Sequence, residues 1–315
     1  MAKALAVNVL QVLLLAGLAP LVSGIIKKTK ALLQTRRGPG ILQPYFDLYK
    51  LLHKESVVSE HTSWIFSATP YIYLAAMLAV CLMLPVVSLA GLLNFSGDLI
   101  LIIYLFALGR FFLALAGLDA GSAFGGMASS REMAVAAVAE PAVMLPLFTL
   151  AVSQGSTNLT AMVAGLDHTW QAFLSPAIWL AFVAFFIVAI AETGRIPVDN
   201  PDTHLELTMI HEGMLLEYSG RQLAMLTLGA SLKQLVIFTL LANVFFPWGI
   251  STGYGPGSLA ISLAAFLGKV IVLALAMAVI ETSFAKMRLF KVPDLLMGSF
   301  LLSLLGIAAK FVFGG

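Results

Sequence analysis

The sequence predicts an all-α, polytopic membrane protein: a helical bundle of about eight transmembrane helices plus an amphipathic surface helix. Its 315 residues have a mean hydropathy of +0.97, and 60% of them are hydrophobic while 11% are charged. This balance is too apolar for a soluble core. Apolar segments of about 20 residues, the length that crosses a bilayer, also recur along the whole chain. Because open sheets cannot satisfy their backbone hydrogen bonds in lipid, we expect these segments to be helices.

About eight segments meet the length requirement. In chain order they are Val7–Ile26, Pro70–Gly91, Leu99–Gly117, Ala134–Val152, Ala177–Ala191, Gln222–Phe246, Leu259–Ile280 and Leu295–Phe313. The fifth is the shortest. The first follows a single lysine and lacks a cleavage site of small residues, so we expect a transmembrane helix there rather than a signal peptide. No repeat or soluble domain separates the segments, and residues 1–315 are expected to form a single integral membrane domain.

Basic residues predict which way the bundle faces. Four connections share one side of it: residues 27–69, 118–131, 192–221 and 283–294. They carry Lys27, Lys28, Lys30, Arg36, Arg37, Lys50, Lys54, Arg131, Arg195, Arg221, Lys286, Arg288 and Lys291. The opposite side has only Lys3 and Lys310. Because lysine and arginine accumulate in cytoplasmic loops, we expect these connections in the cytoplasm and both termini on the non-cytoplasmic side of the cell inner (plasma) membrane.

The first cytoplasmic connection predicts a tight turn followed by an amphipathic helix. Gly38-Pro39-Gly40 favours the turn. Apolar and charged residues then alternate at helical spacing: Ile41, Tyr45, Leu48 and Leu52, with Asp47, Lys50 and Lys54. This pattern is typical of a helix that lies on the membrane surface. We interpret the turn and the helix as a docking platform for a soluble partner. The alternative is that Arg36 and Arg37 only anchor the end of the first transmembrane helix.

The connection from Ala191 to Gly220 is the most informative part of the sequence. It contains six of the 16 acidic residues of the chain: Glu192, Asp199, Asp202, Glu206, Glu212 and Glu217. Carboxylates are costly near a bilayer, so a cluster of them between two very apolar helices favours a proton or ion path.

A helix over residues 201–218 is predicted within this connection, because Asn200 suits the N-cap, Pro201 the first helical position and Gly220 the end. Three carboxylates would then share a stripe about 60° wide: Asp202, Glu206 and Glu217. Neighbouring carboxylates raise one another's pKa, which would let them exchange protons near neutral pH.

Simpler alternatives exist for some of these acidic residues. Glu212 would lie on an adjoining face of the predicted helix. Asp202 could serve only to complement the helix dipole. Glu192 and Arg195 are three residues apart and could form an ion pair at the membrane surface.

The fourth predicted helix contains a second group of candidates. Ser129 and Glu132 fit a capping box, which would give Glu132 a structural role. Glu140 lies about 12 Å into the helix by helical rise and precedes prolines, so it is a candidate relay residue or buried ion-pair partner. Three basic residues fall near the middles of other predicted helices: Arg110, Lys233 and Lys269. They could form a polar axis with Glu140 or only pair inside the bundle.

Cysteine and histidine usage argues against a metal or haem site. Cys81 is the only cysteine, which excludes an internal disulfide and an iron–sulfur cluster held by the chain's own thiolates. The five histidines lie outside the predicted spans, whereas a b-type haem needs ligands at membrane depth. His204 and His211 match no strong metal-binding pattern. We expect no metal site and no nucleic-acid partner.

In combination, the motifs resemble the respiratory complex I subunit 1 family. They are RRGP at 36–39 followed by LQP and DxxKLL, SRE at 130–132, AE at 139–140, and AETGRIPVDNPD with LEYSG in the acidic connection. The resemblance covers essentially the whole chain. The family includes the membrane subunits of energy-converting group 4 nickel–iron hydrogenases and formate hydrogenlyases. The compact RRGPGILQPYFD junction and the HLELTMIHE segment are more similar to this hydrogenase branch, which argues against a long-tailed quinone substrate.

The resemblance implies a place in a larger assembly. The chain would join hydrogenase large and small subunits and iron–sulfur subunits to antiporter-like membrane subunits. The Ni-Fe centre and the iron–sulfur clusters would lie in those partners, with no cofactor bound by this chain. The acidic path of the family maps onto Glu140, Glu192, Asp199, Asp202, Glu206, Glu212 and Glu217. The junction with the soluble module maps onto Arg36, Arg37, Gln43, Asp47, Lys50, Arg131 and Arg195.

The mechanism implied by the resemblance is electrostatic. Redox turnover in the soluble module would shift the protonation of the carboxylates and drive proton or sodium movement, and no bond-making chemistry on a substrate is expected in this chain. Two other classes stay open. One is the quinone-site membrane component of respiratory complex I (NADH:quinone oxidoreductase). The other is a stand-alone secondary transporter, which would tend to show inverted repeats.

Overall fold

The computed structural model describes residues 2–89, 95–167, 175–200, 209–251, 253 and 255–313. Its α-helices are α1 (Ala2–Leu33), α2 (Gln43–Leu52), α3 (Trp64–Met83), α4 (Asp98–Asp119), α5 (Ala123–Gln154), α6 (Leu159–Asp167), α8 (Pro176–Glu192), α9 (Gly220–Val244), α10 (Pro256–Ser283) and α11 (Val292–Phe313). Two short 3-10 helices are η1 (Glu212–Leu215) and η2 (Leu289–Lys291). These described residues form no strand, and the predicted all-α bundle is confirmed.

Seven of the described helices are long and apolar enough to cross a bilayer: α1, α3, α4, α5, α9, α10 and α11. The eighth, α8, is strongly apolar but has only 17 residues, as expected for the shortest span. These eight helices correspond in order to the eight predicted segments.

Several helices extend beyond the predicted spans. α1 continues to Leu33, and α5 begins at Ala123, so the expectation that residues 118–131 form a loop is wrong for most of that range. The short helix α6 was not predicted. Hydropathy finds the apolar middle of a helix, whereas backbone hydrogen bonding continues into polar residues that neighbouring helices cover. Polar residues that look like loop residues in the sequence therefore lie on helices inside the bundle.

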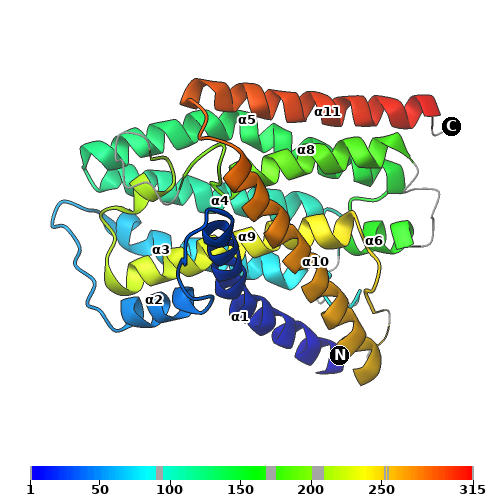
Figure 1. Ribbon diagram of the computed structural model, residues 1–315, viewed down its shortest axis with the longest axis horizontal. Helices are drawn as coiled ribbons and strands as arrows, with labels where there is room; N and C mark the ends of the chain where they lie inside the picture. The colour runs from blue at the N-terminus through cyan, green and yellow to red at the C-terminus, as the bar shows by residue number, and fades with distance from the viewer. Residues whose placement is uncertain are drawn as a thin grey trace.

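Two groups of helices flank α9, while α3 and α4 pack against each other and α3 also contacts α9. In Figure 1, α5, α8 and α11 run side by side along the long axis, while α1 and α10 cross the bundle diagonally as a neighbouring pair. α9 lies between these groups, contacts α1, α3, α8 and α10, and is the most buried of the seven long helices. The polar side chains of Lys233, Gln234, Thr239 and Asn243 on α9 are therefore buried inside the bundle.

The predicted amphipathic helix is present as α2, and none of its residues is buried. It is tied to α1, because the hydroxyl of Tyr45 donates a hydrogen bond to the carbonyl of Gly17. The approach of the preceding segment to α1 requires a glycine. A Cβ added at Gly24 would lie 2.0 Å from the carbonyl oxygen of Ile41. The exposed segment from residue 34 to α2 is thus held in a fixed position against α1.

Candidate functional site

Arg110, in the middle of α4, is the centre of a buried cluster of charged side chains. Its side chain is 7% exposed and contacts three carboxylates. Its Nη2 donates a hydrogen bond to Glu192, and its Nε lies 3.3 Å from an oxygen of Glu132. Its Nη1 lies 3.6 Å from Glu140. Because a buried charge is tolerated only when partners compensate it, these contacts tie α4 to α5 and α8.

Glu192, at the end of α8, shares its carboxylate between two cations. One is Arg110, and the other is Lys233 of α9, whose Nζ lies 2.7 Å from Oε2 of Glu192. Glu192 and Lys233 are 6% and 8% exposed. The central helix α9 therefore supplies a second buried cation to the same carboxylate.

His211 continues the cluster away from Arg110. Its Nε2 lies 3.5 Å from Oε2 of Glu132, and its Nδ1 lies 3.5 Å from Oδ2 of Asp199. Both are ion-pair distances when the imidazole is protonated. Gly194 makes room for the ring: it has a φ of +59°, and a Cβ added there would lie 2.8 Å from Nδ1 of His211. The imidazole therefore bridges two carboxylates that come from separate parts of the chain.

Asp199 is fixed by a second set of contacts. Its Oδ2 accepts hydrogen bonds from the backbone N–H groups of Ile210 and His211, both at 3.2 Å. Its Oδ1 accepts a hydrogen bond of 2.9 Å from Nζ of Lys286, which follows α10. Nη1 of Arg131 donates to the carbonyl of Met209 at 3.3 Å and holds the same segment against α5. The segment around His211 is thus attached to α5 and to the end of α10.

The pKa values of Asp199 and His211 are shifted in opposite directions. Burial raises the pKa of Asp199, but its contacts with His211 and Lys286 outweigh burial and hold the pKa well below its ordinary value of 3.8. Burial lowers the pKa of His211, but the carboxylates of Glu132 and Asp199 outweigh it and raise the pKa above 6.5, even with Lys233 opposing them. The geometry therefore favours an ionised Asp199 beside a protonated His211.

The charges of this cluster balance when His211 is protonated. Its carboxylates are Glu132, Glu140, Glu192 and Asp199, and its permanent cations are Arg110, Lys233 and Lys286. Within the described residues, the fourth positive charge comes from the imidazolium of His211. Because histidine titrates near neutral pH, the proton on His211 is the charge that physiological conditions can most readily change.

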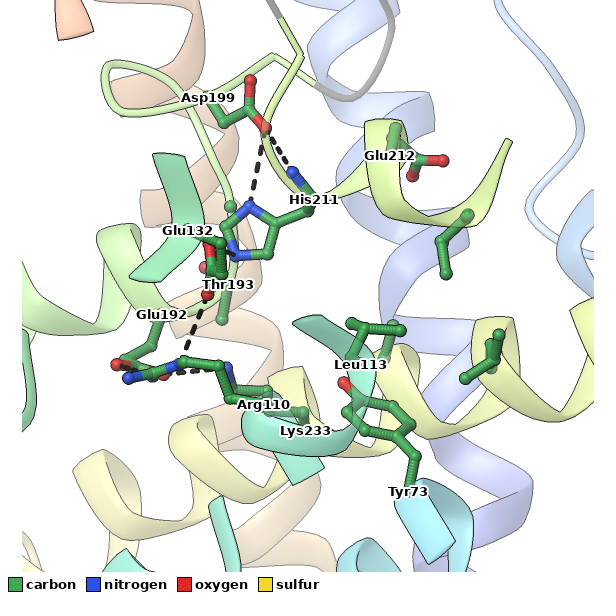
Figure 2. A pocket seen from close by; sticks show the side chains of 14 residues that line it. Tyr73, Arg110, Leu113, Glu132, Glu192, Thr193, Asp199, His211, Glu212 and Lys233 are labelled. Atoms are coloured by element: carbon green, nitrogen blue, oxygen red, sulfur yellow. Dashed lines mark hydrogen bonds and ion pairs between the residues drawn. The ribbon is translucent and has the colours of Figure 1, made fainter. Parts of the chain in front are cut away.

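A cavity of about 100 Å³ lies beside the cluster and is lined by Tyr73, Arg110, Glu132, Glu192, Asp199, His211, Glu212 and Lys233 among others. Figure 2 shows these side chains arranged around it, with Tyr73 of α3 on the side opposite Asp199. Several polar atoms that face it have no well-directed hydrogen bond within the described residues, including Nδ1 of His211 and Oε2 of Glu132. The cavity has room for about three water molecules, which could satisfy these atoms.

Glu140 is the outer end of the cluster. Its side chain is 46% exposed, against 4–7% for Arg110, Glu132 and Glu192. It opens into a groove of about 520 Å³ between α4 and α5 whose other walls include Tyr104, Leu108, Phe111 and Met133. The cluster therefore extends from Lys286, outside the helical spans, to a lateral groove on the surface of the bundle.

The structure brings together several residues predicted from the sequence: Glu140, Glu192, Asp199, Arg110 and Lys233 lie in the cluster, and Glu212 lines the cavity. Lys269 does not join them. Its Nζ donates a hydrogen bond of 2.6 Å to the carbonyl of Phe246, near the end of α9. The expected polar axis is therefore wrong for Lys269, whose ammonium group binds the backbone just after α9 and not the charged cluster.

The predicted helix over residues 201–218 is wrong in its second half. Residues 209–211 are not helical, and only η1 follows. Glu217 is exposed and lies outside the cluster. Asp202 and Glu206 lie outside the described residues. The backbone N–H groups of Ile210 and His211 donate to the carboxylate of Asp199, and these side-chain contacts compete with the backbone hydrogen bonds of a continuous helix.

The suggested capping box is also wrong. α5 begins at Ala123, where the Ser122 hydroxyl accepts a hydrogen bond from the N–H of Gly125. Ser129 and Glu132 lie inside the helix, so Glu132 is a member of the charged cluster rather than a cap. The suggested surface pair of Glu192 and Arg195 does not form either, because Glu192 binds Arg110 and Lys233.

Sequence reasoning missed Glu132, His211, Tyr73 and Lys286 as parts of the site. Their sequence environments explain why. Glu132 had a local explanation, Tyr73 sits in an apolar helix, and Lys286 looked like one more cytoplasmic basic residue. One signal in the sequence could have identified His211: it lies within the acidic connection, directly before Glu212, and a histidine among carboxylates is a candidate proton carrier.

The residues assigned to a soluble-module junction divide into two groups. Arg36, Arg37, Gln43, Asp47 and Lys50 are exposed around the start of α2. There the amide of Gln43 donates a hydrogen bond of 2.8 Å to Asp47. Arg131 is partly buried, and Arg195 is buried with its guanidinium directed at α9 and α10. Burial corrects the expectation that Arg195 is accessible to a partner.

Comparison with known proteins identifies relatives over nearly the whole chain. Residues 5–311 match the family model described as NADH dehydrogenase. The chain is 38% identical to formate hydrogenlyase subunit 4 of Escherichia coli (strain K12) over 291 residues, which covers 92% of this chain and 94% of that protein. It is 36% identical to hydrogenase-4 component C of the same strain, covering 88% and 87% of the two chains.

More distant relatives share the family or the fold. Identity to the H subunit of the NADH-quinone oxidoreductase of Bordetella avium (strain 197N) is 30%, over 69% of this chain and 64% of that one. A chain in the structure of the membrane-bound sulfane sulfur reductase, an archaeal respiratory membrane complex, has the same fold, with a TM-score of 0.82, 22% identity and 98% of both chains covered. The protein belongs to the NADH dehydrogenase family, that of complex I subunit 1, and it is more similar to the hydrogenase and formate hydrogenlyase subunits than to the NADH-quinone oxidoreductase chain.

Proposed function

We propose that this chain is the membrane-embedded connecting subunit of an energy-converting nickel–iron hydrogenase complex. In this role it docks the soluble hydrogenase module and couples redox turnover there to proton or sodium translocation through its buried carboxylates. The observation that carries the proposal is the unbroken series of charged contacts from Lys286 and Asp199 to Glu140. The similarity to formate hydrogenlyase subunit 4 and hydrogenase-4 component C supports the choice of complex.

The imidazole of His211 is the group in this series best suited to carry a proton. It faces one carboxylate through each ring nitrogen, Asp199 through Nδ1 and Glu132 through Nε2. A proton that arrives on one nitrogen can therefore leave from the other. Asp199 and Lys286 lie on the side of the cluster that is outside the spans, so proton exchange with the soluble side enters the series there.

Arg110 has a different role, because a guanidinium keeps its charge in proteins. It holds the carboxylates of Glu132, Glu140 and Glu192 in one place. Proton transfer from Glu132 towards Glu140 must pass around it. Two small cavities of about 10 Å³ flank Arg110, one lined by Glu132 and the other by Glu140, and each has room for about one water molecule on that route. Glu140 then delivers the charge to the lateral groove, where an antiporter-like membrane subunit would receive it.

The coupling is electrostatic. When redox turnover places negative charge beside the cytoplasmic side of the cluster, the protonated form of His211 becomes more favourable; when that charge is removed, the proton is released. Charge effects of this kind are strong where water is scarce. The exposed segment around Arg36, Arg37 and α2 supplies the docking surface, and the asymmetry of basic residues supports its cytoplasmic orientation in the plasma membrane.

Purification of the tagged chain from native membranes in mild detergent tests the proposal. Mass spectrometry of the associated proteins and a hydrogen-evolution assay give the readout. We expect hydrogenase large and small subunits, iron–sulfur subunits and antiporter-like subunits, with hydrogen evolution. An NADH dehydrogenase set with bound quinone would instead assign the chain to complex I, and a solitary chain would assign it to the secondary transporters.

A further inference from the structure

A second buried ionic group lies where α1 and α10 end. Glu281 of α10 is 2% exposed and contacts two cations. Its Oε2 lies 3.2 Å from Nζ of Lys30, in the last turn of α1, and its Oε1 lies 3.2 Å from Nη1 of Arg195. Lys30 and Arg195 are each 8% exposed. One carboxylate therefore compensates two buried cations that come from segments far apart in the sequence.

Polar groups of α1 and α9 complete the surroundings of Arg195. Its Nη2 donates a hydrogen bond of 2.8 Å to Oε1 of Gln234, and the hydroxyl of Ser23 donates to the same oxygen at 3.0 Å. The guanidinium is thus fixed at both ends. These contacts restrict the movement of the backbone at Arg195.

That backbone is the turn that presents Asp199. The carbonyl of Arg195 accepts hydrogen bonds from the N–H groups of Val198 and Asp199, at 2.9 and 3.2 Å. A displacement of Arg195 would therefore be transmitted directly to Asp199 and to its contact with His211.

The end of α10 and the residues after it hold this turn at three points. Glu281 binds Arg195, and the N–H of Met287 donates a hydrogen bond of 2.8 Å to the carbonyl of Pro197. Lys286 binds Asp199 at 2.9 Å. Glu281 also contacts α1, through Lys30. It therefore connects the turn to α1, the helix that leads into the exposed segment from residue 34 to α2, here called the docking segment.

We propose that Glu281 is the positioning residue for the Asp199–His211 contact, and that through Lys30 it links this contact to the end of α1 next to the docking segment. A displacement of α1 caused by the docking of a soluble partner on that segment would then be transmitted to Asp199 through Glu281 and Arg195. This inference rests on the proposed function and adds the connection between its two parts.

The test measures the pH profile of coupled turnover in the intact complex. The charged groups that face His211 are Asp199 in the turn, Glu132 in α5 and Lys233 in α9, with Arg110 of α4 behind Glu132. Loosening the contact with Asp199 removes one of the two carboxylates that favour the imidazolium. In Glu281→Gln we expect the alkaline limb of the profile to move to lower pH by about one unit.

Two further variants keep this test decisive. Glu281→Asp keeps the charge with a shorter reach, and it should assemble and shift the limb in the same direction by less. Asp294→Asn makes the same charge change as Glu281→Gln at an exposed position in the first turn of α11 and should leave the profile unchanged.

Comparison with Asp199→Asn separates this inference from the proposed function. If Asp199→Asn shifts the limb and the assembled Glu281 variants do not, the positioning role is overturned. Loss of the complex in both Glu281 variants would also overturn it and assign Glu281 to the fold alone. If Asp199→Asn itself leaves the profile unchanged, the proposed proton path fails instead.

Discussion

The buried cluster around Arg110 and the exposed segment around α2 use the same kinds of side chain in opposite ways. Arg110 is enclosed and contacts three carboxylates, whereas Arg36 and Arg37 are exposed to solvent. Breaking a buried ion pair by removing one partner costs about 3–5 kcal/mol. An exposed pair contributes about 0–1 kcal/mol. Charges in the cluster therefore constrain the fold, while charges on the exposed segment are available to a partner.

The largest expected effect is that of Arg110→Met. The substitution leaves Glu132 and Glu192 buried without their shared cation, so we expect a loss of about 3–5 kcal/mol of stability and little assembled complex. The amount of complex in membranes and its unfolding temperature in detergent provide the measurement. Arg37→Met makes the same change on the exposed segment and should leave both nearly normal. Equal unfolding temperatures for the two variants would contradict the conclusion that charges in the cluster constrain the fold while those on the exposed segment do not.

Glu140→Gln should separate stability from coupling within the cluster. The side chain is half-exposed and touches Arg110 at 3.6 Å, so its loss should cost less than about 1 kcal/mol. Loss of a protonatable group at the outer end of the path should lower ion translocation by about a hundredfold. Translocation into membrane vesicles, measured beside hydrogen evolution, checks this. Glu60→Gln, an exposed carboxylate far from the cluster in sequence, is the matched control. Normal translocation by assembled Glu140→Gln would contradict the path.

The pH dependence of stability sharpens the comparison further. The folded pKa of His211 lies above its ordinary value of 6.5, so its contribution is complete below pH 6.5 and is lost as the pH rises through the folded pKa. The folded pKa of Asp199 lies below its ordinary value of 3.8, so its contribution is present above pH 3.8 and is lost as the pH falls through that lower pKa.

Above pH 6.5, therefore, the wild-type protein should lose stability with rising pH. His211→Gln should show a flatter dependence over the same range. Unfolding temperatures from about pH 6 to about pH 9 would reveal the difference, since histidine is the side chain that normally titrates at the start of this window. Parallel curves for the two proteins would show that His211 is not held as an imidazolium.

The smallest effect on the chain itself is expected for Arg37→Ala. Its side chain is exposed, so stability should change by less than about 0.5 kcal/mol. Attachment of the soluble module should weaken, and more so at high salt, because the contact would be between exposed charges. Co-purification at increasing ionic strength measures this. Lys310→Ala, at the other end of the bundle in the predicted orientation, should leave attachment unchanged, and unchanged attachment in Arg37→Ala as well would contradict the docking role.

Much of the fold could be predicted from the sequence, because membrane spans depend on local composition. Eight apolar segments gave the eight helices in order, and the spacing around Tyr45 gave α2. The candidate site was predicted less completely. Glu140, Glu192 and Asp199 were found because carboxylates are unusual in such a sequence. Glu132 was not found, because a capping box seemed to explain it locally, and His211 was considered only as a metal ligand. Both residues acquire their roles only from partners elsewhere in the chain.

Composition and the period of the apolar residues by themselves determined that this protein is a helical membrane bundle with acidic residues between its helices, because the cost of burying polar groups in lipid acts on every segment separately. Only the tertiary structure decided which carboxylate meets which cation. Arg110 pairs with residues of α5 and α8, and Glu281 pairs with residues of α1 and the Asp199 turn. The energy of a buried ion pair depends on distances between helices, and those distances are set by the packing of the whole bundle.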